Sequence, residues 1–481
     1  MGTTLRAREY LAKSPTGIDG LDEITFGGLP TGRPTLVCGG PGSGKTLLGI
    51  SFLVNGAVRF NEPGVLMSFE ENAEELAQDV ASLGFDLDAL VAAGKIAVDH
   101  VVIDRSEIEE TGEYDLDGLF VRLEYAINKI GAKRVMLDTP ESLFVGLENH
   151  NILRAELRRL FRWLKSRGLT TVITGERGET TLTRHALEEY VSDAVIAVDH
   201  RVFDQISTRR LRVVKFRGSS HGTNEYPFLI DEEGINVLPL TSLTLMNDAS
   251  AERVSSGLTP LDDMLDGRGF YRGSSILVSG TAGTGKTTLA AHFVDAACRR
   301  HERSLYFLFE ESASQMVRNM RSAGVDLGPW VESGVLQFSA DRPTRYGLEA
   351  HLMTMHRAVE RFQPDVVVLD PITNMLTIGS QVDVRAMLTR MIDFLKMRRV
   401  TALFTSLTAA GGPLETSETL ISSLMDTWIL LDHAPVDRSR RRSLYVLKAR
   451  GIAHSDEVRD LRITDKGITI LGPQPAMVEG G

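Results

Sequence analysis

The chain repeats itself. The segments "GIDGLDEITFGGLPTGRPTLVCGGPGSGKT", from Gly17, and "GLTPLDDMLDGRGFYRGSSILVSGTAGTGKT", from Gly257, can be laid over each other. Further matches follow in the same order: "VLMSFEEN" with "LYFLFEES", "RVMLDTP" with "VVVLDPI", and "VVKFRGSSH" with "YVLKARGIAH". A solenoid unit spans only about 20–45 residues, so a period this long indicates a duplicated domain and not an array of small repeats.

The repeat sets the domain boundaries. At 481 residues, a prior of about 150 residues per domain would suggest three domains, and the duplication reduces that number to two. We expect a first domain over 1–240, a linker over 241–254 within "VLPLTSLTLMNDASAERV", a second domain over 255–467 and a short tail over 468–481.

Each half alternates two kinds of segment. Short runs rich in β-branched residues, such as "PTLVCG", "GVLMSF", "RVMLD" and "TTVIT", are separated by longer amphipathic stretches such as "AEELAQDVASLG" and "ILRAELRRLFRWLKSRG". Alternating strands and helices predict an α/β fold with a parallel sheet covered by helices on both faces. In such sheets ligands bind beyond the carboxyl ends of the strands.

Composition excludes several classes of protein. The formal net charge is −11 and 42% of the residues are hydrophobic, which is typical of a globular protein and argues against a surface designed to neutralise nucleic acid. The N-terminus lacks a signal-peptide core and no run of about 18 apolar residues occurs, so a cytoplasmic protein without membrane contact is expected. Cys38 and Cys298 have no partners at metal-binding spacing and are expected to be buried apolar residues.

Two phosphate-binding loops are the strongest motifs. "GGPGSGKT" (39–46) and "GTAGTGKT" (280–287) both fit the pattern G-x-x-x-x-G-K-[ST], between an apolar strand and a helix-forming run. Their glycines allow backbone N–H groups to surround the β- and γ-phosphates, while Lys45 or Lys286 adds a charge and Thr46 or Thr287 offers a hydroxyl to Mg²⁺.

Carboxylates follow other strands. Asp138 and Asp370 each end an apolar run, where a second carboxylate is expected to hold the water shell of Mg²⁺, although a buried strand that ends in a polar turn would look the same. The pairs Glu70-Glu71 and Glu310-Glu311 could orient or deprotonate an attacking oxygen. Their alternative is a solvated helix start, where acidic residues favour the helix dipole.

Cations recur late in each repeat. "KFRGSSH" and "KARGIAH" place Lys, Arg and His at positions i, i+2 and i+6, and in a strand the first two side chains point to one face. Because each set lies far in sequence from its own phosphate loop, it could reach the nucleotide of a neighbouring subunit as an arginine finger does. Solvated strand charge is the alternative, and "DRSRRRS" (437–443) is interpreted as a basic turn.

A serine pair stands in the apolar run "LISSLMD" (420–426). Serine pairs usually lie in turns or cap helices, and that is the ordinary interpretation of Ser422 and Ser423.

Taken together, these motifs resemble the KaiC family, the double RecA-like ATPases and autokinases of the bacterial circadian clock. The resemblance covers nearly the whole chain through two phosphate loops, "SFEEN", "LFEES", "EEYVSDAVI", "KFRGSSH", "EYPF", "DTWILL" and "DKG". It implies two tandem RecA-like P-loop NTPase domains in a hexameric double ring, single or stacked, with Mg and ATP at the subunit interfaces. The first repeat would be a slow ATPase, and the second a serine/threonine kinase and phosphatase.

The resemblance also assigns residues. Glu70 and Glu310 would be the bases of their pairs, and Glu310 would join Thr46 and Thr287 as a metal ligand. The implied ATP contacts of the first repeat are Gly42, Ser43, Gly44, Lys45, Thr46, Leu47, Ser82, Lys215, Phe216, Arg217, Ser219 and His221. Those of the second are Gly283, Thr284, Gly285, Lys286, Thr287, Thr288, Arg442, Lys448, Ala449, Arg450 and His454.

Ser422 and Ser423 fall on the family's adjacent phosphoacceptors, and Ser417 falls on a third, accessory hydroxyl position. Phosphoryl transfer mainly needs positioning and charge neutralisation, so a serine can accept where a threonine would. The corresponding stretch of the first repeat, "TRHALEEYVSDAV", offers no such pair, which favours kinase activity in the second repeat alone.

The chain departs from the family pattern after both strand-end aspartates, at two residues near the second nucleotide and in the length of its tail. Thr-Pro follows Asp138 and Pro-Ile follows Asp370 where a serine is usual, and Ile452 and Asp456 replace a small polar and a basic residue near the second nucleotide. Only 14 residues follow "DKG". A KaiA partner is therefore not expected, whereas a KaiB-like partner is expected on the first ring near "RSEIEETGEYDLDG".

Two other functions fit the same fold. A RecA-class motor on DNA, such as a recombinase or helicase, shares it, because fold does not settle function. The other is an assembly whose kinase ring is silent and whose ATP hydrolysis only drives partner docking.

Overall fold

The structure is a computed structural model that describes most of the chain. The described residues are 11–101, 116–144, 150–178, 192–203, 206–232, 234–239, 250–408, 419–436 and 439–472.

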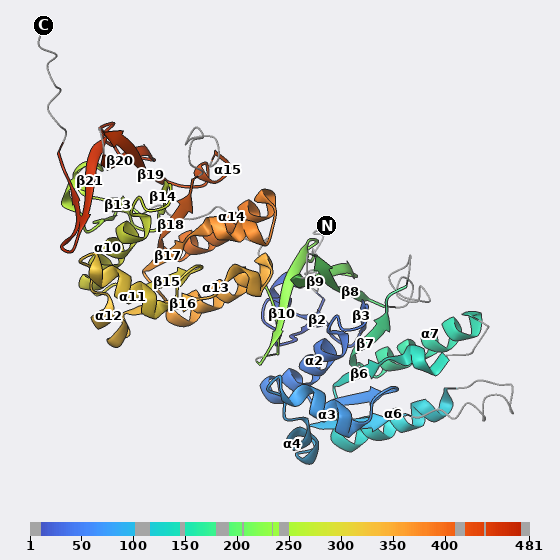
Figure 1. The fold of residues 1–481 in the computed structure, drawn as a ribbon. Helices are drawn as coiled ribbons and strands as arrows, with labels where there is room; N and C mark the ends of the chain where they lie inside the picture. The colour runs from blue at the N-terminus through green and yellow to red at the C-terminus, as the bar shows by residue number, and fades with distance from the viewer. Residues whose placement is uncertain are drawn as a thin grey trace, which may run out of the picture. The chain divides into compact units, whose positions relative to one another are not determined.

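The chain divides into two compact units, Met1–Ser242 and Leu243–Gly481 (Figure 1). Most of the predicted linker lies outside the described residues. Its last part, however, forms strand β12 (Arg253–Val254), which pairs with β13 (Phe270–Tyr271), so the second unit begins before residue 255. At the other end, β22 (Gly467–Ile470) continues past the predicted boundary at 467.

The first unit contains a nine-stranded sheet. In spatial order its strands are β11 (Gly234–Val237), β10 (Glu225–Asp231), β9 (Ile206–Phe216), β8 (Ala194–Phe203), β3 (Pro34–Gly39), β7 (Thr170–Glu176), β6 (Arg134–Asp138), β4 (Gly64–Ser68) and β5 (Ile96–His100). The strands from β8 to β5 are parallel, whereas β9, β10 and β11 are antiparallel hairpin strands at one edge. The parallel sheet predicted from the alternating segments is thus confirmed for six strands and extended by three antiparallel ones. A short separate pair, β1 (Lys13–Ser14) and β2 (Leu29–Pro30), completes the unit.

The second unit repeats this arrangement. Its strands are, in spatial order, β16 (Leu336–Ala340), β15 (Ser304–Leu308), β17 (Val366–Asp370), β18 (Thr401–Leu407), β14 (Ser275–Gly280), β19 (Thr427–Val436), β20 (Ser439–Ala449), β21 (Arg459–Thr464) and β22. Again the strands from β16 to β19 are parallel and the last three are antiparallel.

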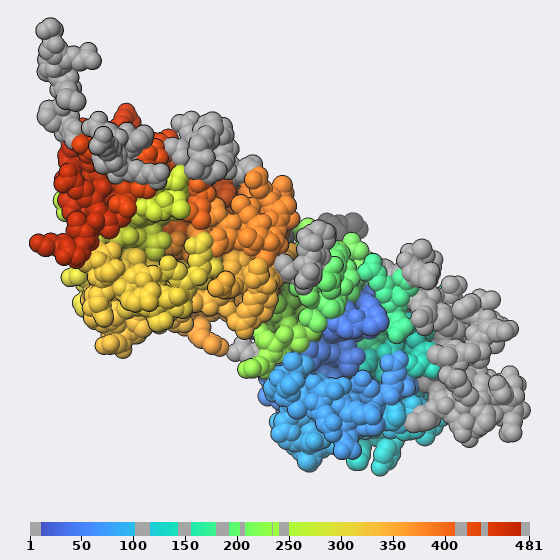
Figure 2. All heavy atoms as spheres, in the orientation of Figure 1, coloured from blue at the N-terminus to red at the C-terminus, as the bar shows by residue number. Residues whose placement is uncertain are grey.

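Helices cover both faces of each sheet. The first unit has α1 (Leu21–Ile24), α2 (Lys45–Arg59), α3 (Ala73–Ala81), α4 (Leu87–Ala92), α6 (Asp117–Ile130), η1 (Pro140–Phe144) and α7 (His150–Ser166). Alternation along β4 shows the two layers, because Leu66 packs in the cluster under α2 while Val65 and Met67 pack under α6 and α7. In the space-filling view, α3 and α4 meet the β10 strand at the surface (Figure 2).

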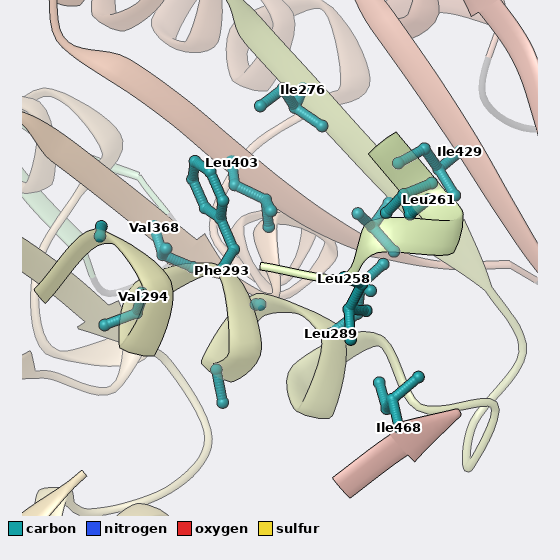
Figure 3. Close-up of a cluster of buried hydrophobic side chains, with 14 of the residues drawn as sticks. Leu258, Leu261, Ile276, Leu289, Phe293, Val294, Val368, Leu403, Ile429 and Ile468 are labelled. Atoms are coloured by element: carbon teal, nitrogen blue, oxygen red, sulfur yellow. The ribbon is translucent and has the colours of Figure 1, made fainter. Parts of the chain in front are cut away.

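The second unit has α9 (Thr259–Asp263), α10 (Lys286–Arg299), α11 (Ala313–Ser322), α12 (Gly328–Glu332), η2 (Pro343–Arg345), α13 (Leu348–Phe362), η3 (Ile372–Thr377), α14 (Gln381–Met397) and α15 (Thr419–Ser422). Figure 3 shows Phe293 of α10 directed toward Val368 and Leu403 of the sheet, with Ile468 of β22 beyond Leu289. This core fixes α10, and with it the phosphate loop that precedes the helix.

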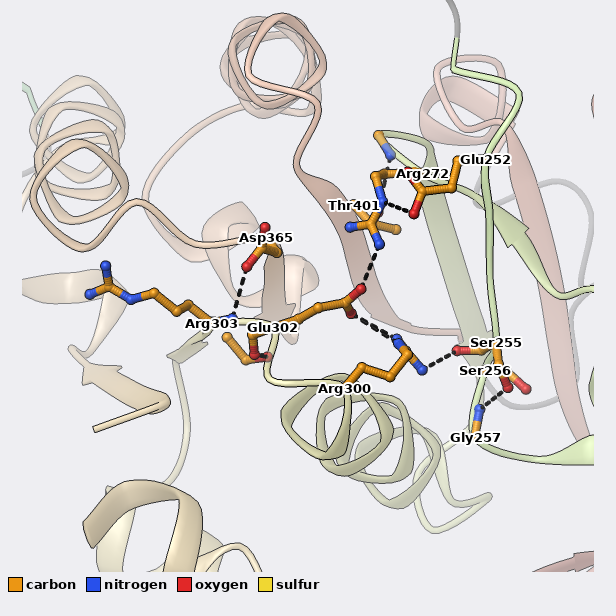
Figure 4. Close-up of polar contacts among 12 residues, drawn as sticks. Glu252, Ser255, Ser256, Gly257, Arg272, Arg300, Glu302, Arg303, Asp365 and Thr401 are labelled. Carbon is orange, nitrogen blue, oxygen red and sulfur yellow. Dashed lines mark hydrogen bonds and ion pairs between the residues drawn. The ribbon is translucent and has the colours of Figure 1, made fainter. Parts of the chain in front are cut away.

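A polar network holds the turn after α10. Glu302 receives hydrogen bonds from Arg272 (2.6 Å) and Arg300 (2.8 Å), and Arg300 also donates to the Ser255 carbonyl (Figure 4). Although burial opposes the effect, these two guanidinium groups lower the pKa of Glu302. Among the described residues, no helix is long and apolar enough to cross a membrane.

Candidate active sites

Each phosphate loop connects a central strand to a helix. In the first unit the loop leaves β3 at Gly39, and α2 begins at Lys45 after Gly44, whose φ of +96° is a conformation that glycine adopts at no steric cost. Lys45 Nζ lies 3.0 Å from the Gly40 carbonyl, and Ser43 Oγ donates to the same oxygen at 2.7 Å.

The second loop has the same form. Gly285 has a φ of +106° before Lys286 begins α10. Lys286 is 6% exposed and its Nζ donates to the carbonyls of Gly280 (2.8 Å) and Thr281 (2.9 Å). In both loops the ammonium group therefore lies inside the backbone curve that the motif predicts for phosphate.

Asp138 lies near the first loop although β7 separates β6 from β3. Thr174 of β7 and Thr46 of the loop both hydrogen bond to its carboxylate. Burial is the main cause of its raised pKa, and the hydrogen bonds from Thr174 and Thr46 oppose the rise. A threonine hydroxyl and a carboxylate side by side are the hard oxygen ligands that Mg²⁺ prefers.

Asp370 holds the matching place in the second unit. Tyr306, fully buried in β15, donates to its Oδ2 at 2.7 Å, and Thr405 of β18 donates to Oδ1. The Asp138–Thr139 and Asp370–Pro371 peptide bonds are both cis.

The first glutamate pair follows β4. Ser142 Oγ donates to Glu70 at 2.6 Å, whereas the Glu71 backbone N–H is bonded to Ser68 Oγ. Burial and the neighbouring carboxylates of Asp79, Asp138 and Glu70 raise the pKa of Glu71. The two members of the pair therefore have different surroundings.

The second pair follows β15 in the same way. Asn374 Nδ2 lies 3.0 Å from Glu310 Oε1, and Asn319 Nδ2 lies 3.1 Å from Glu311 Oε2. Each glutamate is thus held by its own amide.

One arginine of each unit contacts its own phosphate loop. Arg442 of β20 donates to the Gly283 carbonyl at 3.0 Å, which is consistent with its predicted place near the nucleotide. Arg209 of β9 lies 3.5 Å from the Gly42 carbonyl at the matching position of the first unit. Arg209 belongs to none of the motifs recognised in the sequence, although the match of the two strands could have indicated it.

The other late cations lie at the far end of the sheet. Lys215 is opposite Val195 of β8, which is itself opposite Leu36, whereas the first phosphate loop follows Gly39. At ~3.3 Å per residue the separation along the strand is about 10 Å. Lys215, Arg217 and His221 are therefore not gathered around the loop of their own unit.

In the second unit the corresponding lysine and arginine also lie away from their own phosphate loop, and they contact the serine pair. Lys448 lies opposite Trp428, which is opposite Leu277 of β14, while the loop follows Gly280 three residues further on, or ~10 Å along the strand. Lys448 Nζ donates to the Ser422 carbonyl at 2.9 Å, and Arg450 donates to the Ser423 carbonyl at 2.8 Å.

The two serines differ in exposure. Ser423 is exposed and its Oγ lies 3.5 Å from Arg385 Nη2 of α14, whereas Ser422 is 8% exposed. Ser422 ends the short helix α15, so the ordinary interpretation of a helix end describes its backbone correctly.

The remaining predicted ATP contacts are spread over several elements. Leu47 and Thr288 are buried in the first turns of α2 and α10, Phe216 and Ala449 end β9 and β20, and Ser82 is exposed at the end of α3. Ser219 donates to the Ser220 carbonyl, His221 Nδ1 lies 2.9 Å from the Gly222 carbonyl, and His454 Nδ1 lies 3.5 Å from that of Ile452.

Three predictions fall outside the described residues. They are the accessory Ser417, most of the partner segment at 105–118, and the first-repeat stretch that corresponds to the serine pair.

The fold and these sites define a double RecA-like P-loop ATPase. A family model described as "ATPase: KaiC" matches residues 14–242 and again 254–475. The chain is 56% identical over 463 residues, 96% of this chain and 82% of the relative, to "Circadian clock protein KaiC2" of Synechocystis sp.. It is 38% identical over 462 residues, 95% and 89% of the two chains, to "Circadian clock oscillator protein KaiC" of Synechococcus elongatus.

The chain belongs to the KaiC family. The resemblance noted from its motifs is therefore confirmed, and membership of an ATPase family implies that the protein uses a nucleotide.

Proposed function

We propose that the protein is an ATP-hydrolysing serine/threonine autokinase and autophosphatase that works as a hexameric double ring, single or stacked. The first repeat hydrolyses ATP slowly and docks a KaiB-like protein, and the second phosphorylates Ser422 and Ser423. The reaction serves circadian-type timing or stress signalling. No KaiA, nucleic acid or membrane partner is proposed.

The observation that carries this proposal is the distance between the acceptor serines and their own phosphate loop. Lys448 and Arg450 hold the backbone of the serine pair at the start of β14, whereas the loop follows the end of that strand. Leu424, next to the pair, accepts a hydrogen bond from Ser275 Oγ, five residues before Gly280, so a γ-phosphoryl group bound in the loop would be about 16 Å of strand from these serines. Transfer therefore requires the nucleotide of a neighbouring subunit.

The proposed transfer moves the γ-phosphoryl group from ATP to a serine hydroxyl. The serine Oγ forms a bond to the γ-phosphorus, the bond from that phosphorus to the β–γ bridging oxygen breaks, and ADP leaves. Glu310, oriented by Asn374, accepts the hydroxyl proton, while Lys286 and the neighbour's Lys448 and Arg450 offset the phosphate charge. In the first repeat Glu70, oriented by Ser142, would take the proton of the attacking water.

Magnesium fits the oxygen ligands of both repeats. Thr46 beside Asp138 and Thr287 with Asp370 would hold the ion, joined in the second repeat by Glu310. When bound, the ion would neutralise charge that develops on the phosphate oxygens.

Ser423 is the more accessible acceptor. Its exposed hydroxyl lies beside Arg385, a cation able to pair with a phosphate on that oxygen, whereas Ser422 must first become exposed. Ser423 is therefore expected to be phosphorylated before Ser422.

The test mixes two variants in one assembly. Lys286→Ala subunits keep the serines but lose the second nucleotide site, and Ser422→Ala/Ser423→Ala subunits keep the site but lose the acceptors. After mixing with Mg·ATP, intact mass and phosphopeptide mapping should find phosphate on the Lys286→Ala subunits alone. If these subunits stay unmodified while wild type gains phosphate, transfer occurs within one chain.

Wild type supplies the control for the kinase itself. If it gains no mass while ATP is hydrolysed, the autokinase proposal is wrong, and an ATPase switch or a DNA motor is left. DNA-stimulated turnover with steep salt dependence would then indicate the motor.

A further inference from the structure

A polar cavity lies in the first unit beside the middle of α2. Its volume is about 210 Å³. The lining includes Ser51 and Asn55 of α2, Phe85 after α3, and Ile235 and Asn236 of β11. Neither the phosphate loop nor any of the glutamate pair lines it, so the cavity is separate from the predicted catalytic groups.

Two buried polar atoms of this lining are unpaired. Ser51 is 1% exposed, and among the described residues neither its Oγ nor Nδ2 of Asn236 has a hydrogen-bond partner. Buried polar groups are nearly always paired, because an unmade bond costs free energy. A ligand that satisfies Asn236 Nδ2 must offer an acceptor atom.

The second unit indicates the shape of that ligand. At the position of Ser51 in the repeat, α10 carries His292, whose Nε2 accepts a hydrogen bond from the Ile468 amide at 2.9 Å. Its ring lies against Gly467, where a Cβ would be only 2.8 Å from Cε1. An imidazole thus bridges α10 and β22.

The matching amide in the first unit belongs to Ile235. Both residues hold the same place in their hairpins, since Ile235 is opposite Ile230 and Ile468 is opposite Ile463. Phe85, which replaces the smaller Val325, reaches toward Gly234 but leaves the cavity open.

We propose that this cavity binds a small uncharged nitrogen heterocycle of about the size of imidazole, in the place that the His292 ring takes in the second unit. A ring nitrogen with a free lone pair would accept from the Ile235 amide or Asn236, and the ring would pack on Phe85. The ligand would connect β11 to α2, the helix that begins at the nucleotide-binding Lys45. Its effect would therefore be confined to the nucleotide site of the first unit.

The test uses imidazole as the probe on the full-length protein with nucleotide present. Ligand-observed NMR gives the affinity, and a crystal grown with imidazole locates the ring. Because the probe has so few atoms, a dissociation constant of about 1 mM is expected. Pyrrole has the same ring size but no acceptor nitrogen, and should bind at least about fivefold more weakly, which is the effect of one lost hydrogen bond.

Two variants change the number of imidazole molecules that each chain is expected to bind. Ser51→His should fill the cavity with its own ring and abolish binding, and His292→Ser should open an equivalent cavity in the second unit. Wild type should therefore bind imidazole in the first unit, His292→Ser in both units, and Ser51→His in neither.

The outcomes are decisive even if a variant fails to fold. A wild-type crystal with only water in the first cavity, or equal binding of imidazole and pyrrole, would overturn the proposal. So would binding by Ser51→His that equals wild type, since the probe would then lie elsewhere. None of these results depends on whether the serine pair is phosphorylated.

Discussion

Replacing Asn374 by alanine is expected to slow phosphorylation of the serine pair without weakening ATP binding. Asn374 Nδ2 donates to Glu310 Oε1 at 3.0 Å and is placed to orient the carboxylate that would accept the serine proton. Hydrogen bonds to charged groups contribute about 1.5–3 kcal/mol when buried. Because Glu310 is exposed and water can replace the amide, we take about 1 kcal/mol, which corresponds to roughly a fivefold lower rate.

The assay follows phosphate incorporation by intact mass over a series of ATP concentrations. We expect kcat to fall about fivefold while KM stays unchanged, because the amide touches the carboxylate and not the nucleotide. Asn374→Ser, which keeps a donor, should recover part of the rate.

Asn319→Ala is the matched control. It removes the corresponding amide from Glu311, at a similar distance of 3.1 Å, and should leave the phosphorylation rate unchanged. If Asn319→Ala slows transfer and Asn374→Ala does not, Glu311 is the base and the assignment of Glu310 is wrong. If neither variant changes kcat, proton transfer does not limit the reaction.

Three further perturbations test the units separately. Arg134→Leu should lower the free energy of unfolding of the first unit by about 3 kcal/mol, which Trp163 fluorescence in a urea titration would measure. The reason is that the fully buried guanidinium donates to one carboxylate and two carbonyls, and these would lose their partner. Glu302→Gln should destabilise the second unit at neutral pH. Since the folded pKa of Glu302 is lowered, its contribution is complete above the ordinary value of about 4.3 and is lost as the pH falls through the folded value, so variant and wild type should converge in acid. Tyr306→Phe leaves Asp370 Oδ2 without its donor and should cost the second unit about 1–3 kcal/mol, measured by thermal unfolding.

The central architecture could be predicted because its signals are local. Runs such as "RVMLD" and "TTVIT" became β6 and β7, and the phosphate loops lie between β3 and α2 and between β14 and α10 as their motifs require. Each of these signals lies within one short stretch of sequence. The order in which strands pair, by contrast, depends on contacts between distant segments.

The supporting groups of the sites could not be predicted for that reason. Thr174 reaches Asp138 only because β7 lies between β3 and β6, and Ser142 reaches Glu70 across 72 positions of sequence. Neither residue belongs to a motif, and a threonine in a strand is usually just a strand former. A comparison of the repeats could have indicated Thr174, since Thr405 recurs in β18.

The edge strands show a second limit of sequence patterns. Alternation of apolar and polar residues predicts a strand but not its direction, so the hairpins from β9 to β11 and from β20 to β22 were not foreseen. Their direction matters, because it places Arg209 and Arg442 beside the phosphate loops and Lys215 and Lys448 at the opposite end. If the proposed ring forms, one strand would carry cations for two different nucleotides.

The two repeats differ around the reacting groups more than in them. Both keep the loop lysine, the strand-end aspartate and the glutamate pair, but Tyr306, which donates to Asp370, corresponds to the apolar Leu66 in the first unit. Asp138 therefore has no phenol to hold it, and burial raises its pKa. Duplication preserved the phosphate-loop lysine, the strand-end aspartate and the glutamate pair while the supporting side chains changed, and we expect these supporting side chains to set any difference in activity between the two units.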